Sequence, residues 1–298
     1  MRRSKTQWRR TMEVALPLLL LNCIAFGQTK EIEITVNDPR PLAAAIDKLE
    51  ELSGIPINYE DMPVYYEADQ KDVTDTVARR PPPAGYRIIV ARGGQLTVPI
   101  LVDATTGKLN DSEAVKEALF TVISAYSANN FPGGFDVEFY NGVFFVKPVR
   151  YRDEAGATLT KRAVLSAPIT FPEEKRTISQ TLRLILDQIS KASRAEIRRG
   201  TGSDGMGELT MGAQSEPANH VVARFLAPRS APSVASNGTN WDGGLSYRLL
   251  FEPKLGYALN VHRVPNSPRW AVPPSKPYTP PTPRPRTEGP GAGAIEAR

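Results

Sequence analysis

The sequence predicts an α+β fold made of two tandem small modules, followed by a proline-rich tail. Patterns typical of strands and helices occur in the same order in residues 31–150 and 165–265: a strand, a helix and a strand, then a helix and a two-stranded hairpin. Apolar residues recur with a helical period in some segments and alternate with polar residues in others. Because the second half repeats the order of the first with nearly the same spacing, we interpret the chain as an internal duplication.

The first module opens with an expected strand, helix and strand. The segment "EIEITV" at residues 31–36 alternates polar and apolar residues, as a half-buried strand does. The next segment carries a helical stripe of apolar residues, Leu42, Ile46 and Leu49. Asp38 is the expected N-cap of this helix, and Gly54 favours the left-handed conformation that ends one. The following "IPINY" predicts the second strand.

A helix and a hairpin complete the first module. We expect Asp111 or Ser112 to cap a helix with an apolar face at Val115, Leu119, Val122 and Tyr126. The dipeptide Asn141-Gly142 lies between two apolar runs, which is a strong signal for a two-residue hairpin turn. That turn pairs Phe139 with Phe144 and Val137 with Val146 on one buried face.

The second module repeats these elements after a polar connection at residues 151–164. "APITF" and "AEIRR" predict short strands on either side of a helix, and "PANHVVARFL" predicts a shorter helix. A second hairpin is expected to turn around residues 253–256. The apolar stripe of its longer helix consists of Ile178, Leu182, Ile185 and Ile189.

The two ends of the chain differ in composition from the middle. Residues 1–27 combine a basic start with a short apolar run and a small-x-small site at Ala25 and Gly27, which predicts a cleaved signal peptide and a mature start near Gln28. An uncleaved membrane anchor and a lipoprotein at Cys23, the only cysteine, are the alternatives. We therefore expect a periplasmic or secreted protein with no stable membrane span after cleavage. Residues 266–298 are expected to form a disordered tail with polyproline II character.

The charge distribution argues against a nucleic-acid partner. The net charge is +5, of which residues 1–27 contribute +4 and residues 266–298 contribute +3, so residues 28–265 carry 5 − 4 − 3 = −2. A nearly neutral, slightly acidic core has no overall attraction for a polyanion.

The first module resembles the secretin and TonB N-terminal short domain, STN. The pattern of that family is matched by Pro41-Leu42, Ala45-Ile46, Leu49 and Gly54, and in the second helix by Ala114, Ala118-Leu119 and Ile123. Residues 31–150 carry the better match, within a first module of residues 28–150, and residues 165–265 resemble a divergent copy. The resemblance implies small periplasmic α+β modules that bind other proteins. The chain lacks the barrel strands that follow such modules in channels, so a soluble adaptor for secretion or transport machinery is the expected role.

The candidate chemistry is weak, and we expect no catalytic residue, cofactor or metal. "GTGSDG" at residues 200–205 matches a dinucleotide fingerprint formally, but a poor helix former follows it. His220 and His262 are the only histidines, and neither has a carboxylate or histidine at a ligand spacing. A flexible loop and ordinary surface or interface histidines are the favoured interpretations.

An aromatic and acidic stretch is the favoured binding loop. It contains Tyr59, Tyr65, Tyr66 and Glu67, and Trp241 is a weaker candidate in a second loop. Tyrosines can stack on a sugar or a peptide, and paired carboxylates can do acid–base work. The leading expectation is thus a non-enzymatic module that binds an envelope or periplasmic protein. The alternatives are a protein that binds or modifies cell-wall glycan and a structural subunit of a secretion or pilus assembly.

Overall fold

The computed structural model describes residues 28–77, 87–202, 207–227 and 244–265. The expected signal peptide, Trp241 and the proline-rich tail lie outside these residues. Within the described ranges the chain has the predicted α+β composition.

The first half contains a strand, a helix and a strand, then a helix and a hairpin, as the sequence predicts. Further elements lie between the second strand and the second long helix, among them a ten-residue strand at Gly94–Asp103. The elements are β1 (Thr29–Asp38), α1 (Pro41–Ser53), β2 (Ile57–Glu60), η1 (Glu67–Asp69), β3 (Gln70–Asp72), α2 (Thr74–Val77), β4 (Ile89–Ala91), β5 (Gly94–Asp103), α3 (Ser112–Ala128), β6 (Gly134–Tyr140) and β7 (Val143–Arg152).

The second half repeats this order with fewer additions. Its elements are β8 (Thr158–Thr160), η2 (Val164–Ser166), β9 (Pro168–Thr177), α4 (Ile178–Ser193), β10 (Ile197–Arg199), β11 (Glu208–Pro217), α5 (Ala218–Leu226), β12 (Leu245–Glu252) and β13 (Gly256–Arg263). In each half, the strand before the first long helix pairs antiparallel with the strand before the second helix: β1 with β5, and β9 with β11.

The two halves share one sheet, which the sequence does not indicate. The strand order is β10-β13-β12-β2-β7-β6, with β8 beside β7. The first half contributes β2-β7-β6 and the second contributes β10-β13-β12, with the same internal pairing directions. The halves join where β12 pairs parallel with β2. The repeated units therefore meet edge to edge and form a continuous sheet.

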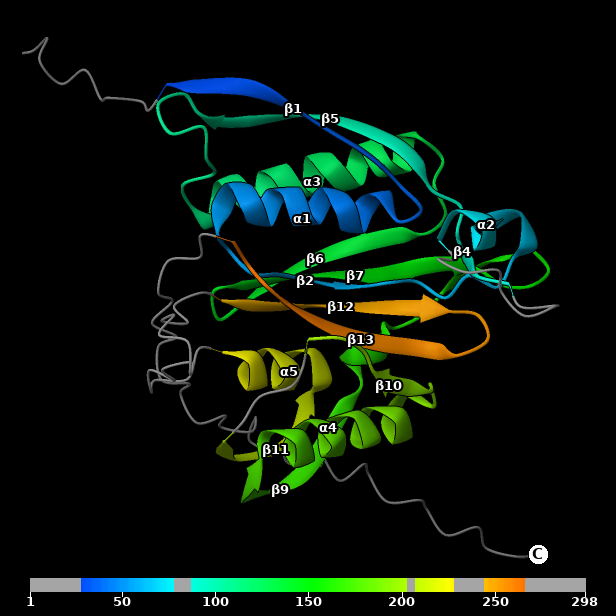
Figure 1. Ribbon diagram of the computed structural model, residues 1–298, viewed down its shortest axis with the longest axis vertical. Coiled ribbons are helices and arrows are strands. Elements are labelled where there is room, and N and C mark those ends of the chain that lie inside the picture. The colour runs from blue at the N-terminus through cyan, green and yellow to red at the C-terminus, as the bar shows by residue number, and fades with distance from the viewer. Residues whose placement is uncertain (1–27, 78–86, 203–206, 228–243, 266–298) are drawn as a thin grey trace, which may run out of the picture.

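Helices cover both faces of this sheet (Figure 1). Helices α1 and α3 lie between the shared sheet and the β1–β5 ribbon, and α4 and α5 lie on the opposite side with the β9–β11 ribbon. Two buried apolar clusters fill these layers. Leu49 is fully buried in the cluster under α1 and α3, and Ile185 is fully buried in the cluster under α4 and α5.

The junction between the halves is held by buried polar contacts as well as by strand pairing. Glu60, at the end of β2, accepts hydrogen bonds from the backbone N–H groups of Val164 and Leu165 at 2.5 and 3.0 Å. Arg40 donates to Asp61 at 2.9 Å and to the carbonyl of Phe251 in β12 at 2.9 Å. The contacts of Glu60 join residues 104 and 105 positions apart, and that of Arg40 with Phe251 spans 211 positions, so the two halves depend on each other at this interface.

The predicted hairpin is confirmed, with one difference in burial. Asn141 and Gly142 have φ values of +48° and +82°, and the predicted pairs form across the turn. Phe144 is buried, but its partner Phe139 is 49% exposed. The difference arises because β6 is at the edge of the sheet, where a side chain has neighbours on one side only.

The helix ends follow local chemistry, with one correction. Gly54 takes the left-handed conformation that ends α1, and Arg194 takes the same conformation after α4, where the sequence has no glycine. Asp111 accepts from the N–H of Ala114 as an N-cap. Asp38 is not the N-cap of α1: it ends β1, and its carboxylate accepts from the N–H of Arg40 at 2.7 Å.

Candidate functional site

The aromatic and acidic stretch divides between the core and the surface. Tyr59 does not line a binding surface, because it is 2% exposed and its hydroxyl donates to Asp61 at 2.9 Å. Tyr66 lies under the guanidinium of Arg152, which is 4.9 Å from the ring centroid. Glu67 is exposed in η1. Tyr65 is the residue of this stretch that meets solvent with a large aromatic surface.

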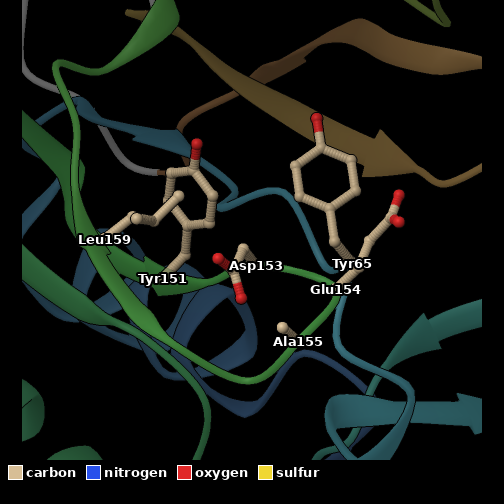
Figure 2. A pocket seen from close by; sticks show the side chains of 6 residues that line it. All are labelled: Tyr65, Tyr151, Asp153, Glu154, Ala155 and Leu159. Carbon is tan, nitrogen blue, oxygen red and sulfur yellow. The ribbon is translucent and has the colours of Figure 1, made fainter.

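Tyr65 borders a shallow cavity of about 410 Å³. The other lining residues are Tyr151, Asp153, Glu154, Ala155 and Leu159, contributed by the end of β7, the turn that follows it and β8 (Figure 2). The rings of Tyr65 and Tyr151 stand 6.0 Å apart at 63°. The ring of Phe251 also contacts Tyr65, with ring centroids 5.6 Å apart at 77°. The site thus has a rigid aromatic wall and a carboxylate rim.

The electrostatics of the cavity favour an uncharged phenol at Tyr65. Burial raises the pKa of Tyr65, and neighbouring Tyr151 and Glu154 raise it further, against the opposing charge of Lys161. Asp153 accepts from the N–H of Ala157 at 2.8 Å, which fixes the turn that carries it. A neutral ring pair beside carboxylates is suited to apolar or cationic groups rather than to anions.

His262 lies in a buried ion-pair network that the sequence does not indicate. Its Nε2 is 2.9 Å from Glu50 Oε2 and 2.9 Å from the hydroxyl of Ser246. Arg248 donates to Glu50 at 2.8 Å and to Asp47 at 2.5 Å. Burial alone raises the pKa of Glu50, but the hydrogen bond to His262 and the charges of Arg248 and His262 outweigh burial and lower it.

This network has the residue types of a hydrolase triad or a metal site, but its contacts fit neither. A triad needs the serine and the carboxylate on different ring nitrogens of the histidine, and here both contact Nε2. Ser246 is fully buried, so no substrate reaches its hydroxyl. Asp47, Glu50 and His262 offer three ligand atoms within 4.8 Å of one another, but the Arg248 guanidinium already forms ion pairs with both carboxylates. We interpret the network as a link between α1 and the second half.

His220 takes part in a second network, at the other end of the shared sheet. Its Nε2 is 2.6 Å from Glu138, and its ring stacks on Tyr140 with centroids 3.8 Å apart and an interplanar angle of 2°. Lys147 donates to the same carboxylate at 2.6 Å, and Asn219 donates at 3.3 Å. Every oxygen of Glu138 is engaged, so this cluster ties α5 to β6 and β7.

Strand β6, at the edge of the shared sheet, carries exposed aromatic residues. Phe139 is 49% exposed and Tyr140 is 37% exposed, and Phe120 on the adjoining α3 is 47% exposed. In the part of the chain that the structure describes, β7 is the only strand paired with β6. This edge was not singled out from the sequence, where its apolar residues indicate a buried face.

The glycine-rich "GTGSDG" segment does not lead into a helix. Gly200 donates its N–H to the carbonyl of Leu259 and extends β10 along β13. After the undescribed residues 203–206 the chain enters strand β11. A dinucleotide site needs a helix N-terminus at this point, so the match does not define a cofactor site.

Comparison with protein-family models, with curated proteins and with solved structures finds no match for this chain. The resemblance to STN domains therefore stays an expectation based on the residues given above. None of the helices within the described ranges has the length and apolar character needed to cross a membrane.

Proposed function

We propose that this chain is an exported, non-enzymatic module of the cell envelope that binds a protein partner by strand addition at β6. The observation that carries the proposal is that no strand among the described residues pairs with the outer edge of β6, where Phe139 and Tyr140 are exposed at one end. A strand edge offers backbone donors and acceptors to a partner strand, and neighbouring side chains supply specificity.

The internal duplication supports this mode of binding. β12 occupies in the second half the position that β6 occupies in the first, as the outer strand of the hairpin. The edge of β12 is covered by β2, which adds in parallel and places Tyr59 beside Arg248. The same kind of edge is therefore covered by a strand in one half and uncovered among the described residues of the other.

The exposed aromatic residues favour a partner with an apolar strand face. Phe139 packs on Phe144 with ring centroids 4.6 Å apart, so its inner side is held in place while its outer side faces solvent. Burying about 100 Å² of such a ring contributes about 2.5 kcal/mol. An aromatic ring with a fixed orientation loses little entropy on binding, and this makes Phe139 the expected anchor of the contact.

A capture experiment tests the proposal. The mature chain, residues 28–298, is immobilised and exposed to envelope extract, and its Phe139→Asp and Leu101→Asp variants are treated in the same way. Leu101 is the matched control because it is 59% exposed on β5, far from β6 in the layer order. We expect a protein retained by the wild type and the control to be lost with Phe139→Asp, while all three melt at similar temperatures. Equal retention by all three proteins contradicts binding at β6.

A further inference from the structure

The cavity beside Tyr65 is suited to a proline-rich segment with positive charges. Its two tyrosine rings stand at an open angle, with Leu159, which is 39% exposed, beside them. Grooves lined by aromatic rings are the recognition surfaces for polyproline II helices, because prolines pack between rings without needing backbone donors. Asp153 and Glu154 at the rim favour cations next to those prolines (Figure 2).

The chain itself contains such a segment. Prolines occur every third residue at 274, 277, 280 and 283. Since a polyproline II helix has three residues per turn, these four prolines fall on one face. Between residues 266 and 287 the chain has four cations and no acidic residue: Arg269, Lys276, Arg284 and Arg286. The row of prolines complements the tyrosine rings of the cavity, and the positive charge complements its carboxylates.

The end of the described chain lies within reach of the cavity. Tyr257 pairs with Phe251, which contacts the ring of Tyr65, so β13 begins close to the cavity. From Tyr257 to Val264 the strand runs about 23 Å away from it, at ~3.3 Å per residue. The nine peptide steps from Pro265 to Pro274 span about 28 Å in a polyproline II helix. The segment can therefore return to the cavity of its own molecule.

We propose that residues 274–283 bind as a polyproline II helix against Tyr65, Tyr151 and Leu159 of the same chain, with the tail cations beside Asp153 and Glu154. This contact is separate from the β6 edge and does not depend on the proposed partner. The segment is already restricted by its prolines, so little entropy opposes its binding. Its attachment to the same chain supplies a high effective concentration, which makes a shallow site sufficient.

The test uses the full mature chain with a nitroxide spin label in the tail. Thr279→Cys provides the only cysteine after signal-peptide removal, and the label broadens backbone amide signals of nearby residues in NMR spectra. We expect loss of the signals of Tyr65, Tyr151 and residues 153–159. Signals of exposed residues on α4, such as Arg183, are expected to persist and serve as the internal reference.

Two variants separate binding from accidental proximity. Tyr65→Ala removes a ring that is 42% exposed, and Tyr140→Ala is the control because it removes a ring that is 37% exposed at the β6 edge. The double variant Pro277→Ala and Pro280→Ala changes only the tail and leaves the folded part intact. Broadening is expected to disappear with Tyr65→Ala and with the tail variant and to remain with Tyr140→Ala. Broadening that is absent in the parent protein, or that survives Tyr65→Ala and the tail variant, overturns the proposal.

Mixing and competition distinguish other occupants of the cavity. If broadening occurs only when labelled tail and observed cavity belong to different molecules, the tail binds a second copy and the proposal of binding within one chain fails. A synthetic peptide of residues 271–287 is expected to restore the lost signals. A chitin oligosaccharide is expected to leave them unchanged, and recovery with the oligosaccharide alone identifies the cavity as a glycan site instead.

Discussion

Replacing Glu60 with glutamine is expected to remove a pH dependence of folding stability. Glu60 is 2% exposed at the junction of the two halves. Burial raises its pKa from 4.5 to about 7, in spite of hydrogen bonds from Leu165 and Val164 and the charge of Lys147, which oppose the shift, while Asp61 adds to it. The folded protein therefore holds this proton more tightly than the unfolded chain does.

The sign and size of the effect follow from this difference. Between pH 4.5 and pH 7 the folded state binds more protons, so the free energy of unfolding falls as the pH rises. The contribution of Glu60 is fully present below pH 4.5 and is lost as the pH rises through 7. A difference of about 2.5 pKa units corresponds to about 3 kcal/mol. Glu60→Gln stays neutral and is expected to lack this loss. Its amide has one acceptor oxygen in place of two, so one of the N–H groups of Val164 and Leu165 loses its acceptor, at a cost of about 1–3 kcal/mol.

Urea unfolding of wild type and Glu60→Gln at pH 5, 6, 7 and 8 measures the effect. From pH 5 to pH 8, the free energy of unfolding of the wild type is expected to fall by about 2–3 kcal/mol relative to that of Glu60→Gln. The other titrating groups contribute equally to both proteins and therefore cancel in this comparison. Glu117→Gln, at an exposed position on α3, is the control and is expected to show no pH-dependent difference. A difference between wild type and Glu60→Gln that is constant from pH 5 to pH 8 refutes the reasoning.

The remaining predictions concern the cores and the α1 network. Leu49→Ala and Ile185→Ala each empty a fully buried position in a different apolar cluster, and each is expected to lower the free energy of unfolding by about 2–5 kcal/mol in urea titrations. A loss below 1 kcal/mol at either position would show that it is not a packed core site. Arg248→Met leaves Glu50 buried without its cation and is expected to cost about 3–5 kcal/mol at pH 7. Arg183→Met, exposed on α4, is its control, and equal stability of these two variants contradicts a buried ion pair.

Some features of the fold were predictable because they depend on a few neighbouring residues. Gly54 ends α1 because glycine enters the left-handed region without a steric penalty. Asn141-Gly142 sets the β6–β7 turn for the same reason, and this turn then determines which residues pair. The apolar stripes of α1 and α4 identified Leu49 and Ile185 as buried, since one face of a surface helix must cover a core.

Long-range contacts decided the parts of the site that the sequence did not predict. Glu50 and Arg248 are 198 positions apart, and no local pattern indicates that α1 of one half packs on β12 of the other. The same is true of His220 and Glu138, which become partners only after α5 and β6 are placed in one sheet.

The aromatic stretch shows most clearly which features the local sequence predicts and which depend on the tertiary structure. Local composition alone singled out Tyr59 and Tyr65 together as tyrosines in an acidic segment. Because β12 adds to β2, Tyr59 is enclosed in the core, while Tyr65 lies beyond the paired strand and meets Tyr151 at the cavity. The sequence by itself determined the strand-helix-strand, helix and hairpin order of each half, since this follows from short-range backbone preferences and periodicity, but strand β11 was not among the elements it predicted. Only the tertiary structure decided which edges are covered and which tyrosine faces solvent, because burial depends on partners that are distant in the chain.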